Sequence, residues 1–99
     1  MPKKSKKKET DYEALHSSFM QIPSMKTEIA RGMMDAGIRE AYELRGRAPE
    51  VVLEGMLAKH PALKGIPDLR ERVELAVYFM ETDDPDPRKL RLSHWSSIQ

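Results

Sequence analysis

The sequence contains no cysteine, few aromatic residues and no long apolar run. Without cysteine, the chain can form neither a disulfide framework, nor a thiolate nucleophile, nor a cysteine-ligated zinc site. No apolar stretch approaches the roughly 18 residues that a membrane-spanning helix needs. The basic N-terminus is not followed by the apolar segment of a secretory signal. We therefore expect a cytoplasmic protein that has no contact with a membrane and uses no cofactor.

The sequence also lacks residue patterns typical of catalytic and metal sites. His16, His60 and His94 lie in three separate segments without the spacing of metal ligands. The acidic residues of 83–87, DDPDP, are interrupted by prolines and do not resemble a calcium-binding loop. There is no Ser-His-Asp arrangement and no P-loop. We predict no catalytic residue and no metal site, and therefore a protein that is not an enzyme.

Charge is distributed unevenly along the chain, although the net charge is only +1. Residues 9–99 carry 12 Lys and Arg side chains against 16 Asp and Glu. Residues 1–8 carry no acidic side chain and five lysines, which are Lys3, Lys4, Lys6, Lys7 and Lys8. Because these charges repel one another, residues 1–10 are predicted to be a disordered basic arm, and residues 11–99 a helical domain. The arm would attract phosphates in a salt-sensitive, sequence-independent way, although a purely solubilising tail accounts for it equally well.

The folded part is predicted to begin at Asp11, a good N-cap. Tyr12, Leu15 and Phe19 follow at three- and four-residue steps, which predicts a short helix. The Ile22-Pro23 step ends this helix, because the residue before proline avoids the α region.

The next helices are predicted from their caps and apolar faces. Ser24 or Thr27 can cap a helix that ends at Gly37, where a left-handed residue would close it and Ile38 would fold back. A helix of one or two turns follows over 39–44, and Pro49 then begins another that ends at His60-Pro61. The apolar face of the first of these helices consists of Ile29, Ala30, Met33 and Met34.

The stretch 69–82, LRERVELAVYFMET, is predicted to be the central core helix, with an apolar stripe that consists of Leu69, Val73, Ala76, Val77 and Met80. The prolines of 83–87 end it, and a short C-terminal segment containing Trp95 is expected to pack back on the body. No segment alternates with the period of a strand. The fold class predicted is all-α: one compact domain of about five short helices, with a folded part of roughly 85–90 residues.

Four stretches in this order carry a family resemblance: IPSMKTEIARGMMDAGI at 22–38, then ELRGRAPEVV, VELAVYFMETDDPDP and KLRLSHW. Over about residues 12–97 the chain resembles the small bacterial helix-hairpin-helix family known as pathogenicity-locus or mitomycin-resistance proteins. The resemblance implies a helix-hairpin-helix unit within 22–38. The chain also departs from the family pattern. Lys26 stands where the family has its hairpin glycine, and Trp95 alone remains of the aromatic residues in the family's tail.

The resemblance implies binding to a DNA backbone. In such a unit, backbone N–H groups at the turn and at a helix N-terminus hold one phosphate without reading the base sequence. If the turn required a positive φ at residue 26, Lys26 would cost about 1 kcal/mol or more. The lysine could instead contact the phosphate itself, together with the hydroxyl groups of Ser24 and Thr27 and the guanidinium of Arg31. Glu28 at the same helix start would repel a phosphate.

Two functional hypotheses remain open at this point. The first is a non-catalytic module that binds the DNA backbone weakly and salt-sensitively through Ser24, Lys26, Thr27, Arg31 and the arm lysines. The second is a protein-interaction module that keeps the hairpin as a packing scaffold and has lost DNA binding. Trp95 motivates the second, because a lone tryptophan near a chain end either anchors a tail or docks on an unidentified protein partner. The sequence leaves the oligomeric state open.

Overall fold

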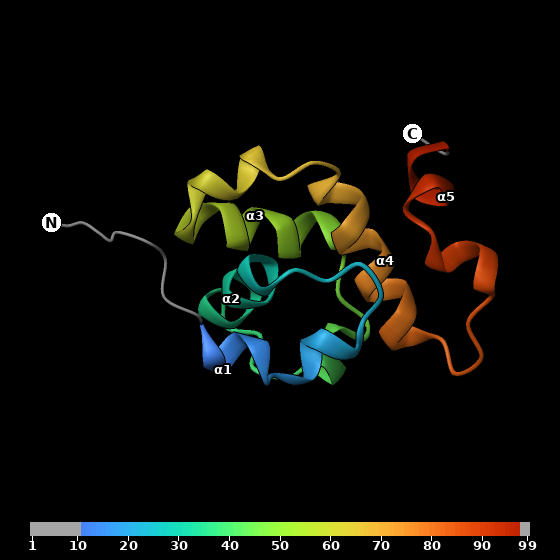
Figure 1. The fold of residues 1–99 in the computed structure, drawn as a ribbon, viewed down its shortest axis with the longest axis horizontal. Helices are drawn as coiled ribbons and strands as arrows, with labels where there is room; N and C mark the ends of the chain where they lie inside the picture. The colour runs from blue at the N-terminus through green and yellow to red at the C-terminus, as the bar shows by residue number, and fades with distance from the viewer. Residues whose placement is uncertain (1–10, 98–99) are drawn as a thin grey trace, which may run out of the picture.

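The computed structural model describes residues 11–97, which fold into short helical segments without any strand in that range (Figure 1). The α-helices are α1 (Tyr12–Leu15), α2 (Thr27–Asp35), α3 (Pro49–Lys59), α4 (Leu69–Glu81) and α5 (Leu92–Ser97). The 3-10 helices are η1 (Ser18–Gln21), η2 (Ala41–Leu44), η3 (Pro61–Gly65) and η4 (Pro87–Leu90). The predicted all-α class is confirmed. The predicted disordered arm, residues 1–10, lies outside the described residues.

α4 lies at the centre of the core, as its apolar stripe predicts. Val73, Leu75 and Ala76 are completely buried, and the helix packs against α3, η2 and α5 (Figure 1). α2 in turn packs between α1 and α3. The buried side chains from all these elements form one continuous cluster, so the described residues make one compact domain. None of the helices in this range is both long and apolar enough to cross a membrane.

The N-terminal helix differs from the expectation. Asp11 does cap α1, accepting a hydrogen bond from the Ala14 amide at 3.2 Å, but α1 ends after four residues and η1 starts separately. Ser17 adopts an extended backbone, and its hydroxyl donates to the Ala14 carbonyl at 2.6 Å, which competes with continued helix. The break turns Phe19 fully into the core. Tyr12 and Leu15, which the helical spacing puts on one face with Phe19, remain 65% and 40% exposed.

The end of α2 follows its sequence signal. Gly37 has φ +102°, and its amide donates to the Met34 carbonyl at 3.1 Å. The Ile38 amide donates to the Met33 carbonyl at 2.9 Å, and the Ile38 side chain is buried. This pair of bonds is the Schellman motif that a glycine followed by an apolar residue predicts.

The C-terminal segment packs back on α4, as expected. The indole N–H of Trp95 donates to the Lys89 carbonyl at 2.8 Å, and its ring lies 5.6 Å from the ring of Tyr78 on α4. Trp95 is therefore half-buried and anchors the tail within its own chain.

Candidate nucleic-acid interface

The candidate site is the turn of residues 22–26, here called the hairpin turn, which joins η1 to α2. The turn is closed by a hydrogen bond from the Met25 amide to the Ile22 carbonyl, 3.2 Å long. Ser24 adopts a left-handed backbone with φ 64°. Lys26 then has an extended backbone (φ −115°, ψ 150°) and is the N-cap residue of α2. A helix-hairpin-helix unit would have an α-helix on each side of such a turn; here the preceding element is the single 3-10 turn η1, so that unit stays a prediction.

The backbone geometry corrects two expectations about this turn. Neither Ser24 nor Thr27 is the N-cap of α2, and the side chain of the actual N-cap, Lys26, makes no capping hydrogen bond. The extended backbone of Lys26 suits any residue, so a lysine causes no backbone strain there. The left-handed residue is Ser24, where a side chain costs about 1–2 kcal/mol relative to the right-handed region.

Arg72 on α4 holds the hairpin turn in place. Its Nη1 donates to the Ser24 carbonyl at 2.7 Å, and its Nε donates to the Pro67 carbonyl at 3.0 Å. Pro67 precedes Asp68, a second non-glycine residue with a left-handed backbone, φ 60°. One guanidinium group thus connects the hairpin turn to the start of α4. The sequence gives no sign of this contact, because Arg72 and Ser24 lie 48 positions apart.

Lys26 is exposed and forms no ion pair with any residue of the 11–97 range. It directly precedes the first turn of α2, whose amide groups have no acceptor within the helix and carry the positive end of the helix dipole. Glu28, also exposed, brings one negative charge to the same turn. The local arrangement therefore combines a solvent-facing ammonium group, the half-buried Thr27 and a helix N-terminus, which together favour an anion.

Arg31 has a different environment from the one expected. Its guanidinium bonds to Asp11 (Nε–Oδ2, 2.8 Å; Nη2–Oδ1, 3.0 Å), to Glu13 at 2.7 Å and to Asp35 at 3.2 Å. These bonds use four of its five N–H groups. Three carboxylates around one cation leave an excess of negative charge, which disfavours a phosphate. The structure thus places Arg31 in an ion-pair network between α1 and α2, where its pKa is raised by the hydrogen bonds to Asp11, Glu13 and Asp35.

The same network depresses the pKa of Asp11 and of Asp35. Hydrogen bonds from the Arg31 guanidinium and from the Ala14 amide lower the pKa of Asp11 to about 2. The pKa of Asp35 is also lowered, chiefly by its hydrogen bond with His60 and further by Arg31. His60 is the C-cap residue of α3, and its Nε2 lies 2.6 Å from Asp35 Oδ2. The network therefore joins α1, α2 and α3.

Because the folded-state pKa of Asp11 lies below its ordinary value of 3.8, the ion pair stabilises the fold fully above that pH. This contribution is lost as the pH falls towards about 2. Asp11→Asn keeps an N-cap acceptor but removes the charge. We expect the wild type to exceed this variant in urea midpoint at neutral pH, and the difference to shrink between pH 3.8 and about 2. The control is Asp84→Asn, and a difference that stays constant down to pH 2 would contradict the ion-pair assignment.

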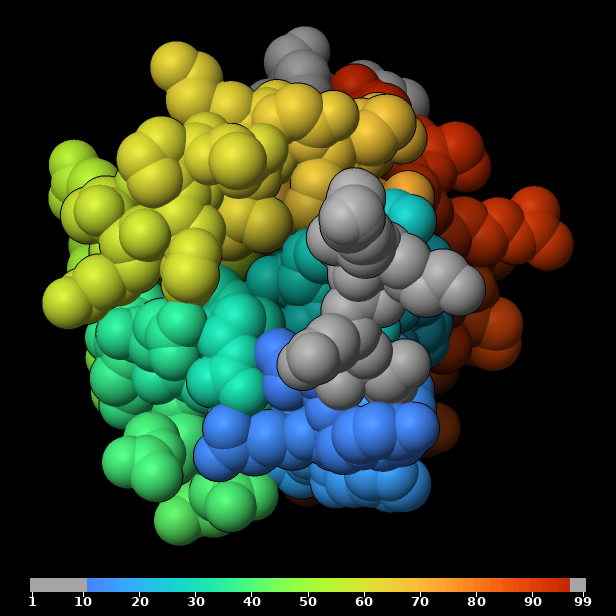
Figure 2. All heavy atoms as spheres, turned by 60° about the vertical axis from the view of Figure 1, so that its left-hand side comes forward, coloured from blue at the N-terminus to red at the C-terminus, as the bar shows by residue number. Residues whose placement is uncertain are grey.

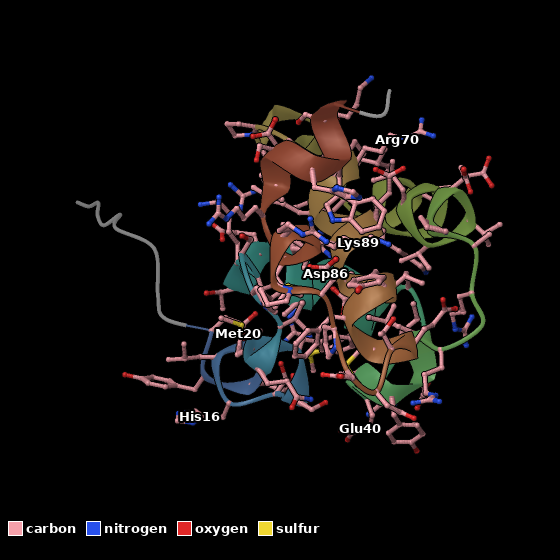
Figure 3. The ribbon with its side chains drawn as sticks, turned by 90° about the vertical axis from the view of Figure 1, so that its right-hand side faces the viewer. His16, Met20, Glu40, Arg70, Asp86 and Lys89 are labelled. Carbon is pink, nitrogen blue, oxygen red and sulfur yellow. The ribbon has the colours of Figure 1, made fainter. Side chains whose placement is uncertain are left out.

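The potential metal-ligating side chains do not gather at one place in the described structure. In the range 11–97, no three His, Asp or Glu side chains converge where they could hold a metal ion. A surface hollow of about 300 Å3 lies between residues 13–18 and residues 39–40 and is lined in part by Ser18 and Glu40. The Ser18 hydroxyl donates to Glu40 at 3.0 Å and accepts from the Ala41 amide at 2.8 Å, so it ties η1 to η2. The labelled His16 and Glu40 mark this lower edge of the molecule in Figure 3.

The structure thus brings Ser24, Lys26 and Thr27 together and adds Arg72, while Arg31 belongs to a separate ion-pair network. The arm residues Lys3, Lys4, Lys6, Lys7 and Lys8 lie outside the described residues. The fold and this site define a small all-α protein with an exposed basic turn in front of a helix. Comparison with protein-family models, with curated proteins and with solved structures found no match to this chain.

Proposed function

We propose that the protein is a non-catalytic module that binds the phosphate backbone of DNA, weakly and without sequence preference, through the hairpin turn. The observation that carries the proposal is the position of Lys26, which is exposed, free of ion pairs with residues 11–97 and placed directly before the N-terminus of α2. Phosphate is the ligand for which a helix N-terminus and an adjacent ammonium group are both favourable. The resemblance to the helix-hairpin-helix family supports the same partner, and we propose that the protein acts in the cytoplasm.

The charge distribution determines how such binding would behave. Residues 11–97 carry 12 Lys and Arg side chains against 15 Asp and Glu, so the body as a whole repels DNA. The five lysines of residues 1–8 supply the long-range attraction, and the turn supplies a local contact. Binding of this kind falls steeply with salt, because each phosphate contact releases condensed counterions.

Lys26→Gln tests the proposal in the full chain. The probe is a fluorescent duplex of about 20 base pairs, titrated by anisotropy between about 50 and 200 mM salt. We expect the variant to bind several-fold more weakly and the slope of log K against log salt to fall by roughly 1, with a larger loss for Lys26→Glu. The control is Lys64→Gln, which removes an exposed lysine from η3, outside the hairpin turn.

Two results would refute the proposal. One is the absence of any anisotropy change for the wild type at about 50 mM salt. The other is equal affinity of Lys26→Gln and Lys64→Gln for the duplex, which would show that the turn is not part of the interface. A chain lacking residues 1–10 separates the contribution of the arm, because its loss of affinity and slope reports the arm lysines alone.

The alternative function, a protein-interaction module, depended on Trp95 as a docking residue. Trp95 has partners within its own chain, the Lys89 carbonyl and the Tyr78 ring. The feature that motivated this alternative is therefore accounted for by anchoring of the tail, and DNA-backbone binding is the function that the geometry favours.

A further inference from the structure

The last described segment, residues 87–97, is the most basic part of the described chain. It carries Arg88, Lys89 and Arg91 and no acidic side chain. Residues 11–86, by contrast, carry nine Lys and Arg side chains against 15 Asp and Glu. An otherwise acidic body thus has one element with an excess of positive charge, here called the C-terminal basic segment, which makes this element a suitable contact for a polyanion.

The fold brings this segment to the same side of the molecule as the hairpin turn. After α4 the chain reverses through η4, and α5 runs back along α4 towards the end at which Arg72 holds the turn (Figure 1). Figure 2 shows the orange-red atoms of the segment next to the cyan atoms of the turn. Figure 3, which looks onto the segment, places labelled Lys89 near the centre of the view and labelled Met20, which lies on η1 just before the turn, to its left.

The segment is held firmly rather than attached as a loose tail. The Asp86 amide donates to the Tyr78 hydroxyl at 2.8 Å, and the Trp95 indole donates to the Lys89 carbonyl at 2.8 Å. The Tyr78 and Trp95 rings pack at 5.6 Å between these two bonds. The cations of the segment therefore project from a fixed backbone, which lowers the entropy lost when they contact a ligand.

Two of the three cations are available for such a contact. Arg88 is paired with Asp86 at 3.1 Å. Lys89 and Arg91 form no ion pair with residues 11–97; Arg91 is exposed, and the Lys89 ammonium lies 5.6 Å from the centre of the Tyr78 ring. Lys89 is thus attracted by the aromatic face and, over a longer distance, by the Asp86 carboxylate, but no carboxylate of residues 11–97 lies within ion-pair distance of it.

We propose that the C-terminal basic segment is a second contact for the DNA backbone, in which Lys89 and Arg91 bind phosphates beyond the one held at the hairpin turn. This inference rests on the proposed function of the turn, which orients the duplex. A phosphodiester backbone fits the observations because it presents repeated negative charges along its length, so one strand can meet both the turn and the neighbouring segment. Such contacts position the protein on the duplex and carry no base information.

The test compares Arg91→Gln and the double variant Lys89→Gln/Arg91→Gln with Lys26→Gln and the control Lys64→Gln, all in the full chain. With the same duplex of about 20 base pairs, we expect the double variant to reduce the salt slope by roughly 2 and Arg91→Gln by roughly 1. Affinity should fall at least about fivefold for the double variant at about 100 mM salt. The emission of Trp95 should stay unchanged in each variant, which shows that the segment is still anchored.

The outcomes separate this inference from the proposed function. If Lys26→Gln weakens binding and the double variant matches Lys64→Gln, the turn binds DNA alone and the segment is not a contact. If the double variant weakens binding and Lys26→Gln does not, the segment is a contact and the proposed role of the turn fails. If polyglutamate competes as well as unlabelled duplex for the wild type but not for the double variant, the segment binds acidic chains in general, and its assignment to DNA is overturned.

Discussion

Phe19→Ala is expected to remove a large part of the stability of the domain. The Phe19 side chain is completely buried, although it belongs to a single 3-10 turn. Truncating a buried phenylalanine costs about 3–5 kcal/mol, through lost burial and the cavity that remains. A domain of this size has only about 5–10 kcal/mol in total, so the urea midpoint followed by far-UV circular dichroism should fall sharply.

The matched control is Tyr12→Ala. Tyr12 is 65% exposed and its ring stacks against His16, 6.2 Å between centroids, so its truncation should change the free energy of unfolding by less than about 0.5 kcal/mol. The helical spacing of the sequence gives Tyr12 and Phe19 the same inward orientation. Equal losses for the two variants would mean that α1 and η1 continue as one helix with both rings in the core.

Features that depend on a few neighbouring residues could be predicted from the sequence. Pro49 begins α3, Asp11 caps α1, and Gly37 with Ile38 closes α2, because each of these signals acts within one helical turn. α4 was equally predictable, since its apolar stripe is long enough to determine which face is buried.

The N-terminal helix could not be predicted correctly, because its apolar spacing fits one continuous helix and also two separate turns. Two separate turns form because the Ser17 hydroxyl bonds to the Ala14 carbonyl and because Phe19 and Ala14 are buried in the core. Leu15 stays partly exposed. Packing of this kind overrides the local pattern when an element is only four residues long.

The candidate site shows the same division between local and distant contacts. The exposure of Lys26 at the start of α2 follows from its immediate neighbours. The absence of Arg31 from the site could not be predicted from neighbouring residues, because its partner Asp11 lies 20 positions away. Arg72 could be read from the sequence only as one charge of an exposed helix face, since its bond to Ser24 exists only once α4 has packed beside the turn.

Arg72→Met is expected to loosen the hairpin turn and, under the proposed function, to weaken binding to a DNA duplex. The variant keeps the apolar stem but loses the bonds to the Ser24 and Pro67 carbonyls, 2.7 and 3.0 Å long. Hydrogen bonds to charged groups contribute about 1.5–3 kcal/mol, and the exposure of these two bonds places the expected loss of stability near 1–3 kcal/mol. The measurements are the urea midpoint, hydrogen exchange at the Met25 amide, which closes the turn, and duplex anisotropy.

Arg70→Met is the matched control, because Arg70 lies on the same helix and is half exposed. Its ion pairs with Glu50 and Glu74 are 3.6 and 3.5 Å long, and because the Arg70 side chain is half exposed we expect them to contribute about 1 kcal/mol or less. Arg72→Lys can reach only one of the two carbonyls and should restore part of the Met25 protection. If Arg72→Met instead behaves like Arg70→Met in all three measurements, the left-handed Ser24 is held by the turn itself. Because the left-handed backbone of Ser24 is unfavourable on its own, we expect the contact from α4 to be required.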